Sequence, residues 1–157
     1  MTAPAWYNDG KILKVGEVYP FNFIKLVMLA DGEQYMIMED IFEMRHMVMY
    51  CHFLKYNLTP GQKVNCRVDK VNCTGRVILE PEHPVYKIGS VAEFAVLRIE
   101  SGKSPESLDK VIVSDIFGNE IHFETKTSEL NLSDNKIDCL IEGLKKGKPI
   151  LRFAKTI

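Results

Sequence analysis

The chain contains an internal repeat, and this repeat limits the possible folds more than any other feature. VGEVYPFNFIKL begins at Val15, and IGSVAEFAVLRI begins 73 residues later at Ile88. Cys66 and Cys139 are also 73 residues apart, within the similar segments KVNCRVDKVNCTGRVIL and KIDCLIEGLKKGKPIL. A fixed offset over separate segments indicates duplication of a whole structural unit, and two copies are too few for a solenoid. We therefore predict two small domains in tandem.

The connection between the two domains is predicted at PEHP, residues 81–84. Two prolines in four residues stiffen a connection, and proline cannot continue the interior of a sheet. We therefore predict a first domain over residues 1–83, with an N-terminal arm, and a second domain over residues 84–157. EDIFEM at Glu39 matches SDIFGN at Ser114 with an offset of 75, which indicates a two-residue insertion in the second copy.

Apolar residues alternate with polar ones along both copies, which is typical of strands with one buried face. Residues 64–68 form such a series, followed by a short glycine-containing turn and a second apolar run, so each domain is expected to end in a β-hairpin. In the first strand, Phe21, Phe23 and Lys25 are expected to share one face. The strands expected before the hairpins are residues 16–29, 35–38 and 45–50 in the first copy and 91–100, 110–114 and 120–125 in the second.

Three strands, a connector at residues 51–57 and a closing hairpin are typical of a five-stranded Greek-key barrel of the OB type. The segment PGQKVNCRVDKVNCTGRVILEPEH also resembles the closing half of an S1-type RNA-binding domain, and VGEV at Val15 is similar to the opening of that family. The residues that carry the resemblance are Gly61, Val64, Val68, Asp69, Arg76 and the aliphatic run Val77 to Leu79. The combination of DIF followed by RH with the segment from CRVDKVNC to LEPEHP is also similar to bacterial S1-like proteins. The resemblance implies an all-β chain of two tandem five-stranded OB-fold (S1-like) barrels.

The composition restricts the classes of protein to which the chain can belong. The formal net charge is −1, with −1 on residues 1–84 and 0 on residues 85–157, so nucleic acid would have to bind a local patch. Cys66 and Cys139 fall on the apolar faces of expected strands, where free thiols behave as small hydrophobes. Free thiols, no signal-like N-terminal segment and no run of about 18 apolar residues predict a cytoplasmic protein without a membrane partner.

The first copy carries the residue types that bind single-stranded nucleic acid. An OB barrel binds ligands on its second and third strands and on the loops after the first and fourth. Aromatic side chains stack on unpaired bases and cations hold phosphates, so we predict binding of single-stranded nucleic acid, RNA in preference to DNA. The predicted binding residues are Phe23, Lys25, Tyr35, Arg45, His46, Tyr50 and His52. Because side chains alternate along a strand, Arg45 is expected to point outward and His46 inward.

The second copy is less suited to this function, because Glu120 and Glu124 on its third strand would repel phosphates. The alternative function for the whole chain is a protein-interaction module, since methionine-rich surfaces adapt to varied partners. The methionines concerned are Met36, Met38, Met44, Met47 and Met49. A third interpretation is that Tyr35 and Tyr50 only cover the barrel and that Arg45 is a solvated surface charge.

Metal binding and catalysis are not predicted. Cys51 and His52 are adjacent, and Cys66 and Cys73 are too far apart in sequence for a zinc knuckle, so we predict no metal. No phosphate-binding glycine loop and no activated nucleophile are recognisable, so we predict no catalytic residue, no cofactor and no enzymatic activity. The aspartates of the two matching DIF segments are expected to accept backbone N–H bonds in turns.

Overall fold

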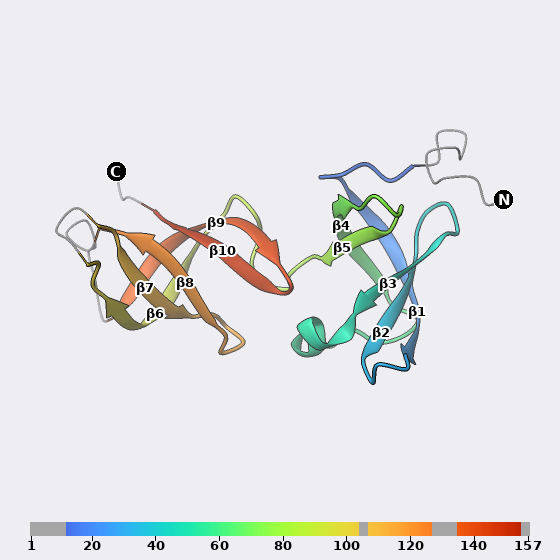
Figure 1. Ribbon diagram of the computed structural model, residues 1–157, viewed down its shortest axis with the longest axis horizontal. Coiled ribbons are helices and arrows are strands. Elements are labelled where there is room, and N and C mark those ends of the chain that lie inside the picture. The colour runs from blue at the N-terminus through green and yellow to red at the C-terminus, as the bar shows by residue number, and fades with distance from the viewer. Residues whose placement is uncertain (1–11, 104–106, 127–134, 155–157) are drawn as a thin grey trace. The chain divides into compact units, whose positions relative to one another are not determined.

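Strands make up most of both copies of the repeat, as Figure 1 shows for the computed structural model. The residues that the structure describes are 12–103, 107–126 and 135–154. The expected N-terminal arm, residues 1–11, lies outside them. The chain divides into two units after Glu82, so His83 joins the second unit and not the first. We call these parts the first unit and the second unit.

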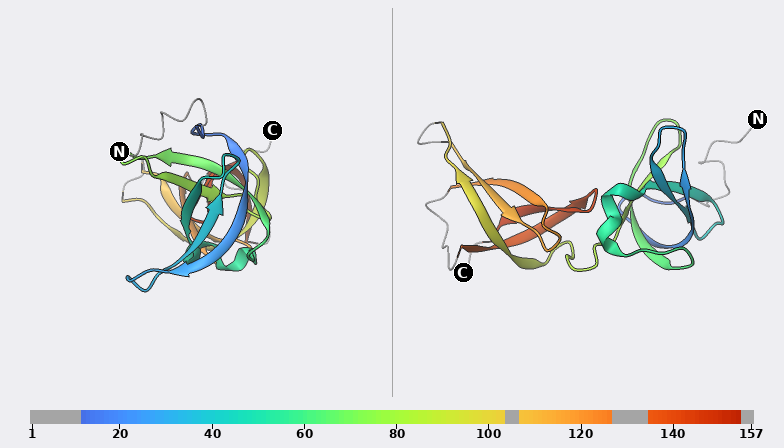
Figure 2. Two further views of the ribbon diagram at one scale, coloured as in Figure 1. Left: turned by 90° about the vertical axis from the view of Figure 1, so that its right-hand side faces the viewer. Right: turned by 90° about the horizontal axis from the view of Figure 1, so that it is seen from below.

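The first unit is built on an antiparallel sheet of five strands. Its elements are β1 (Val18–Met28), β2 (Gln34–Glu39), β3 (Arg45–Met49), the short 3₁₀ helix η2 (Tyr50–Tyr56), β4 (Lys63–Val71) and β5 (Val77–Pro81). The strand order is β3-β2-β1-β4-β5, and the outer strands β3 and β5 also contact each other. The sheet therefore curves into a barrel, which Figure 2 shows end-on in its left-hand view.

The second unit repeats this arrangement. Its strands are β6 (Val91–Glu100), β7 (Asp109–Ser114), β8 (Glu120–Thr125), β9 (Lys136–Lys145) and β10 (Lys148–Phe153). The strand order β8-β7-β6-β9-β10 is equivalent to that of the first unit, and the outer strands β8 and β10 contact each other. The prediction of an all-β chain with two tandem five-stranded barrels of the OB type is confirmed.

The duplication extends to individual residue pairs. Val18 of β1 pairs with Arg67 of β4, and Val91 of β6 pairs with Leu140 of β9, so both partners shift by the same 73 residues. The pairing of β2 with β3 is repeated between β7 and β8 at the offset of 75. The two units therefore share strand order and register, as the sequence repeat predicts.

A β-bulge in the first strand of each unit reverses the alternation of its side chains. In β1 the pairing with β2 shifts between Phe23 and Lys25, and in β6 the corresponding shift falls between Val96 and Arg98. Before the bulge, Phe21 and Phe23 are fully buried, whereas Lys25 beyond it is exposed. The expectation that Phe23 and Lys25 share one face is therefore wrong.

Each unit has its own apolar core. The largest fully buried side chains of the first unit include Phe21, Phe23, Met36, Met38, Cys66 and Val68. The core of the second unit includes Phe94, Val111, Val113, Ile137, Cys139 and Ile141. Because Met36 and Met38 are fully buried, they cannot contribute to a methionine-rich binding surface. Met44 and Met47 are the exposed methionines on or beside β3.

The burial of two cysteines leads to a prediction about thiol reactivity. Cys66 and Cys139 are fully buried, whereas Cys51 and Cys73 are exposed, and all four thiols are free. Burial raises the pKa of the Cys66 thiol and raises that of Cys139 to about 12, so both lack the reactive thiolate near neutral pH. We expect a maleimide to label Cys51 and Cys73 rapidly in the native protein and the other two only after unfolding. Peptide mass spectrometry with and without denaturant measures this, and rapid native labelling of Cys66 or Cys139 would contradict it.

The first residue of the second unit, His83, leads to a prediction about pH. Its ring is buried between Tyr86 and Phe117, with ring centroids 4.6 and 5.0 Å away. Its Nδ1 accepts the backbone N–H bonds of Val85 and Tyr86, both 3.0 Å long, which requires an unprotonated nitrogen. Burial lowers the pKa of His83, and the nearby Asp115 carboxylate opposes this effect.

Because the unfolded chain has an ordinary histidine pKa of about 6.5, it binds more protons than the folded chain below that pH. The free energy of unfolding of the second unit should therefore fall as the pH drops from about 6.5 towards the lower pKa of the folded state. Urea denaturation across this range, followed by NMR signals of the second unit, measures the effect. His83→Gln keeps an acceptor but does not titrate. If the pH dependence of stability persists in this variant, it arises from a titrating group other than His83.

Candidate nucleic-acid interface

The outer face of the first unit is defined by β1, β2 and β3. Met36 and Met38 of β2 are fully buried, so the alternating side chains of Tyr35, Ile37 and Glu39 lie on the opposite side of the sheet. The pairing of the three strands places these side chains in rows with those of their neighbours. The rows are Asn22, Glu39 and Arg45; Lys25, Ile37 and Met47; and Val27, Tyr35 and Met49. We call this surface the outer face.

Three of the predicted binding residues lie on the outer face. Lys25 is exposed and makes no ion pair with a residue that the structure describes. The side chain of Arg45 is 56% exposed, and its Nε lies 3.5 Å from a carboxylate oxygen of Glu39. Tyr35 is only 8% exposed, and its hydroxyl donates to Asp31 at 3.3 Å, so it offers less stacking surface than its position predicts.

Two predicted residues face the interior instead. Phe23 is fully buried in the core, so its assignment to the binding face is wrong; the reason is the bulge, which turns only the residues beyond it outward. The side chain of His46 is 14% exposed and packs edge-on against the ring of Phe21 at a centroid distance of 6.1 Å. The expected alternation of Arg45 outward and His46 inward is present.

The remaining predicted residues, Tyr50 and His52, lie on η2 after the end of β3 and outside the three rows. Both are partly buried, and the ring of His52 packs edge-on against Phe53. The predicted set is therefore divided between the outer face, the interior and η2.

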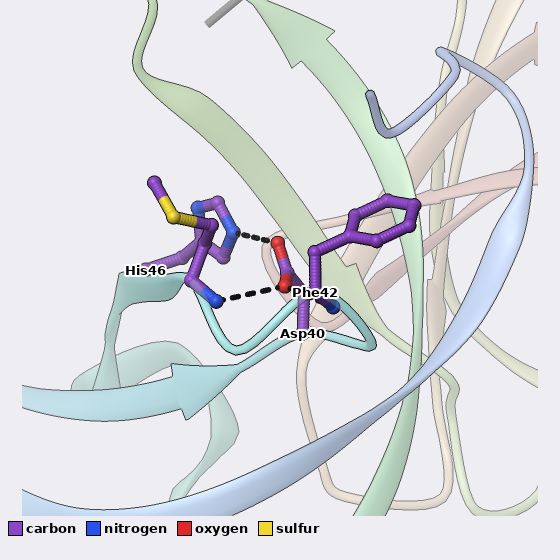
Figure 3. A network of polar contacts seen from close by, with 4 residues as sticks. Asp40, Phe42 and His46 are labelled. Carbon is purple, nitrogen blue, oxygen red and sulfur yellow. Dashed lines mark hydrogen bonds and ion pairs between the residues drawn. The ribbon is translucent and has the colours of Figure 1, made fainter. Parts of the chain in front are cut away.

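The turn between β2 and β3 is organised by Asp40, which is 5% exposed (Figure 3). Its Oδ1 accepts N–H bonds from Phe42 at 2.7 Å and from Met44 at 2.9 Å, and its Oδ2 lies 2.8 Å from His46 Nε2. These contacts fix the start of β3 and hence the outward direction of Arg45.

The corresponding turn of the second unit is organised in the same way. Asp115 Oδ1 accepts N–H bonds from Phe117 at 2.9 Å and from Asn119 at 2.8 Å. Its Oδ2 accepts a bond from the Asn119 side chain at 3.0 Å, in place of the contact that His46 makes in the first unit. The expectation that these aspartates accept backbone N–H bonds in turns is confirmed.

A pocket of about 350 Å³ lies where β3 meets the hairpin of β4 and β5. It is lined by Ile12, Leu13, Asp40, Met44, Arg45, His46, Met47, Val71, Gly75, Arg76 and Val77. Arg45 and Met47 belong to both the pocket and the outer face. Burial and the Asp31 carboxylate raise the pKa of the Tyr35 hydroxyl, and the Arg76 guanidinium opposes them.

Arg76 is a candidate binding residue that is absent from the predicted set. It directly precedes β5, and the loop after the fourth strand of an OB barrel takes part in ligand binding. It is also the basic residue of the segment for which a resemblance to S1 domains is predicted. That combination is the signal by which it could have been found from the sequence.

The equivalent face of the second unit pairs its arginine with acids. Arg98 occupies the position of Lys25, and it pairs with Glu120 at 2.6 Å and with Glu100 at 3.6 Å. Glu120 itself occupies the position of Arg45. Glu124 lies at the position of Met49, so acids replace a cation and an apolar residue of the first unit.

Comparison with known proteins adds no functional assignment. No model of a known protein family matches the chain, and no curated protein matches it either. Within the described ranges, no group of three or more His, Cys, Asp or Glu residues could hold a metal ion. The same ranges contain no helix with the length and apolar character to cross a membrane.

Proposed function

We propose that the first unit binds single-stranded nucleic acid, RNA in preference to DNA, without catalysing a reaction. The observation that supports this most strongly is the difference between the two equivalent faces. The face of the first unit presents Lys25 and Arg45, and Glu39 is the acid in its rows. On the face of the second unit, Arg98 is paired with two glutamates. The duplicated fold does not require this difference, so it is attributed to a ligand of the first unit.

The surface supplies both interactions that a single strand needs. Lys25, Arg45 and Arg76 come from separate elements and can follow a phosphate backbone across β1 to β3 towards the hairpin of β4 and β5. Ile37 and Met47 of the outer face provide surface against which bases can pack, and the partly exposed Tyr50 of η2, just after β3, adds an aromatic ring outside the rows. A local patch of this kind is compatible with the formal net charge of −1.

The preference for RNA follows from the similarity of the closing hairpin to S1-type domains, which we extend to function as part of the proposal. The Asp40 and His46 side chains are engaged with each other and with the turn, so the proposal gives them a structural role. A cytoplasmic location is proposed because all four thiols are free.

A second candidate function is protein binding. Met44 and Met47 are 50% and 39% exposed and lie beside the pocket, where they offer an adaptable apolar surface. Apolar protein contacts weaken little with salt, whereas phosphate contacts weaken steeply, so salt dependence separates the two functions.

Fluorescence anisotropy with a short labelled RNA strand tests the nucleic-acid proposal at two salt concentrations. We expect Lys25→Glu and Arg45→Glu each to weaken binding by about tenfold or more, and to reduce the salt slope by about one, because a phosphate contact is lost. We expect Tyr50→Ala to cost about 1–3 kcal/mol of binding free energy through lost stacking.

Lys110→Glu is the matched control, because Lys110 lies on β7 of the second unit and should leave binding unchanged. A DNA strand of the same sequence measures the preference, and tighter DNA binding would contradict the RNA part alone. Absence of RNA and DNA binding at low salt would contradict the whole proposal and leave protein binding as the better candidate.

A further inference from the structure

The position of the pocket at the edge of the outer face suggests what it binds. The rows of the outer face run across β1, β2 and β3, and β3 is the last hydrogen-bonded strand on that side of the sheet. The pocket begins at Arg45 and Met47 and extends to the turn before β5. A strand bound along the rows would therefore reach the pocket where the paired part of the sheet ends.

We propose that this pocket binds the terminal nucleotide of a single strand, with its phosphomonoester held between Arg45 and Arg76. The inference rests on the proposed function and adds recognition of a strand end to it. Arg76 is exposed and forms no ion pair with the described part of the chain. Arg45 has only the exposed contact to Glu39, and such exposed pairs contribute about 0–1 kcal/mol.

The charge of the pocket suits a terminal phosphate better than an internal one. A phosphomonoester carries about −1.5 to −2 charges near pH 7, because its second pKa is about 6, whereas a phosphodiester carries one. Two guanidinium groups offer planar donors that bind phosphate oxygens in pairs. Among the described lining residues, Asp40 is the acid, and its oxygens are occupied by the turn and by His46.

The size and lining of the pocket suit one nucleotide. About 350 Å³ is near the lower end of the usual range of about 300–1,000 Å³ for small-ligand sites. Leu13, Val71 and Val77 supply apolar surface for a base beside the two arginines.

The second unit differs at the decisive positions. Tyr86 replaces Leu13, and its ring packs 5.1 Å from Phe94 while its hydroxyl accepts the Ile116 N–H. Glu120 occupies the position of Arg45. Terminal-nucleotide binding is therefore assigned to the first unit alone.

The test compares short RNA strands that end in a 5′-phosphate, in a 3′-phosphate or only in hydroxyl groups, by anisotropy on the full chain. We expect one terminal phosphate to tighten binding by about five- to tenfold relative to the hydroxyl-ended strand, which corresponds to about 1–1.4 kcal/mol. Arg76→Gln should abolish this difference, because the phosphorylated strand should lose about five- to tenfold more affinity than the hydroxyl-ended strand loses. Lys148→Gln, at the equivalent turn of the second unit, should change neither value.

Two further measurements separate the possible outcomes. A nucleoside monophosphate should compete with the phosphorylated strand better than inorganic phosphate or the nucleoside does, and Met44→Trp, which fills the pocket from an exposed position, should prevent the competition. If phosphorylated and hydroxyl-ended strands bind equally, or if Arg76→Gln weakens both equally, the terminal site is wrong and the proposed function stands. If no strand binds, both are wrong.

Discussion

Replacing Phe23 with alanine is expected to lower the free energy of unfolding of the first unit by about 3–5 kcal/mol. The side chain is fully buried in the first core, so its truncation removes apolar contacts and leaves a cavity. Total stabilities of small domains are about 5–15 kcal/mol, so this loss is a large part of the whole. Urea denaturation followed by NMR signals of the first unit measures it, and signals of the second unit serve as an internal reference.

The neighbouring residue Lys25 provides the matched control. Lys25→Ala should change stability by less than about 0.5 kcal/mol, because the side chain is exposed, but it should weaken RNA binding. If Phe23→Ala is too unstable to study, Phe23→Leu should still destabilise the unit by about 1–1.5 kcal/mol. If Phe23→Ala left stability unchanged and reduced RNA binding, Phe23 would be a residue of the binding face, and its burial before the bulge would be contradicted.

Replacing Asp40 with alanine is expected to destabilise the first unit by about 3 kcal/mol. The change removes the acceptor of two backbone N–H groups and the partner of His46 at a site that is 5% exposed. Unsatisfied donors at a buried site lose their bonds to the protein without regaining those to water. The same urea measurement detects the loss.

Two variants define the cause of this effect. Asp40→Asn keeps one oxygen acceptor for the Phe42 and Met44 N–H groups, so its cost should be smaller than that of Asp40→Ala. Asp115→Ala should destabilise the second unit to a similar extent, because Asp115 accepts two equivalent N–H bonds. A large effect in one unit and none in the other would show that the turn hydrogen bonds are not the common cause.

The parts of the fold that could be predicted from the sequence depend on local signals that occur twice. Gly16 and Gly89 hold left-handed conformations, with φ of 89° and 88°. Each donates a backbone hydrogen bond of 2.8 Å, to the carbonyl oxygen of Val68 in β4 and of Ile141 in β9 respectively. Left-handed backbone favours glycine, so both positions are visible in the repeated VGEV and IGSV segments. The burial of Cys66 and Cys139 is likewise predicted by the apolar residues that alternate with polar ones on both sides of each cysteine.

The parts of the site that could not be predicted depend on geometry with no local signal. Nothing in FNFIKL marks the bulge after Phe23, because apolar residues surround it on both sides and either phase of alternation fits them. Arg76 joins Arg45 at one pocket only because β3 and β5 meet in the closed sheet, a contact between residues distant in sequence. Tyr35 lies on the expected face, but its burial depends on neighbours from other strands.

The shared register of the two units has a consequence for folding during protein synthesis. β1 meets β4 as β6 meets β9, so β9 is also a register-compatible partner for β1, and mispairing between repeats is a known failure of tandem proteins. Closing the longer loop to β9 costs only about 0.8 kcal/mol more than closing the loop to β4. Core volume also distinguishes the two partners, because pairing of β1 with β9 would place Phe23 where the second unit has the smaller Val96. On the ribosome β4 emerges before β9 has been made, so β1 can pair with β4 before its second compatible partner is available.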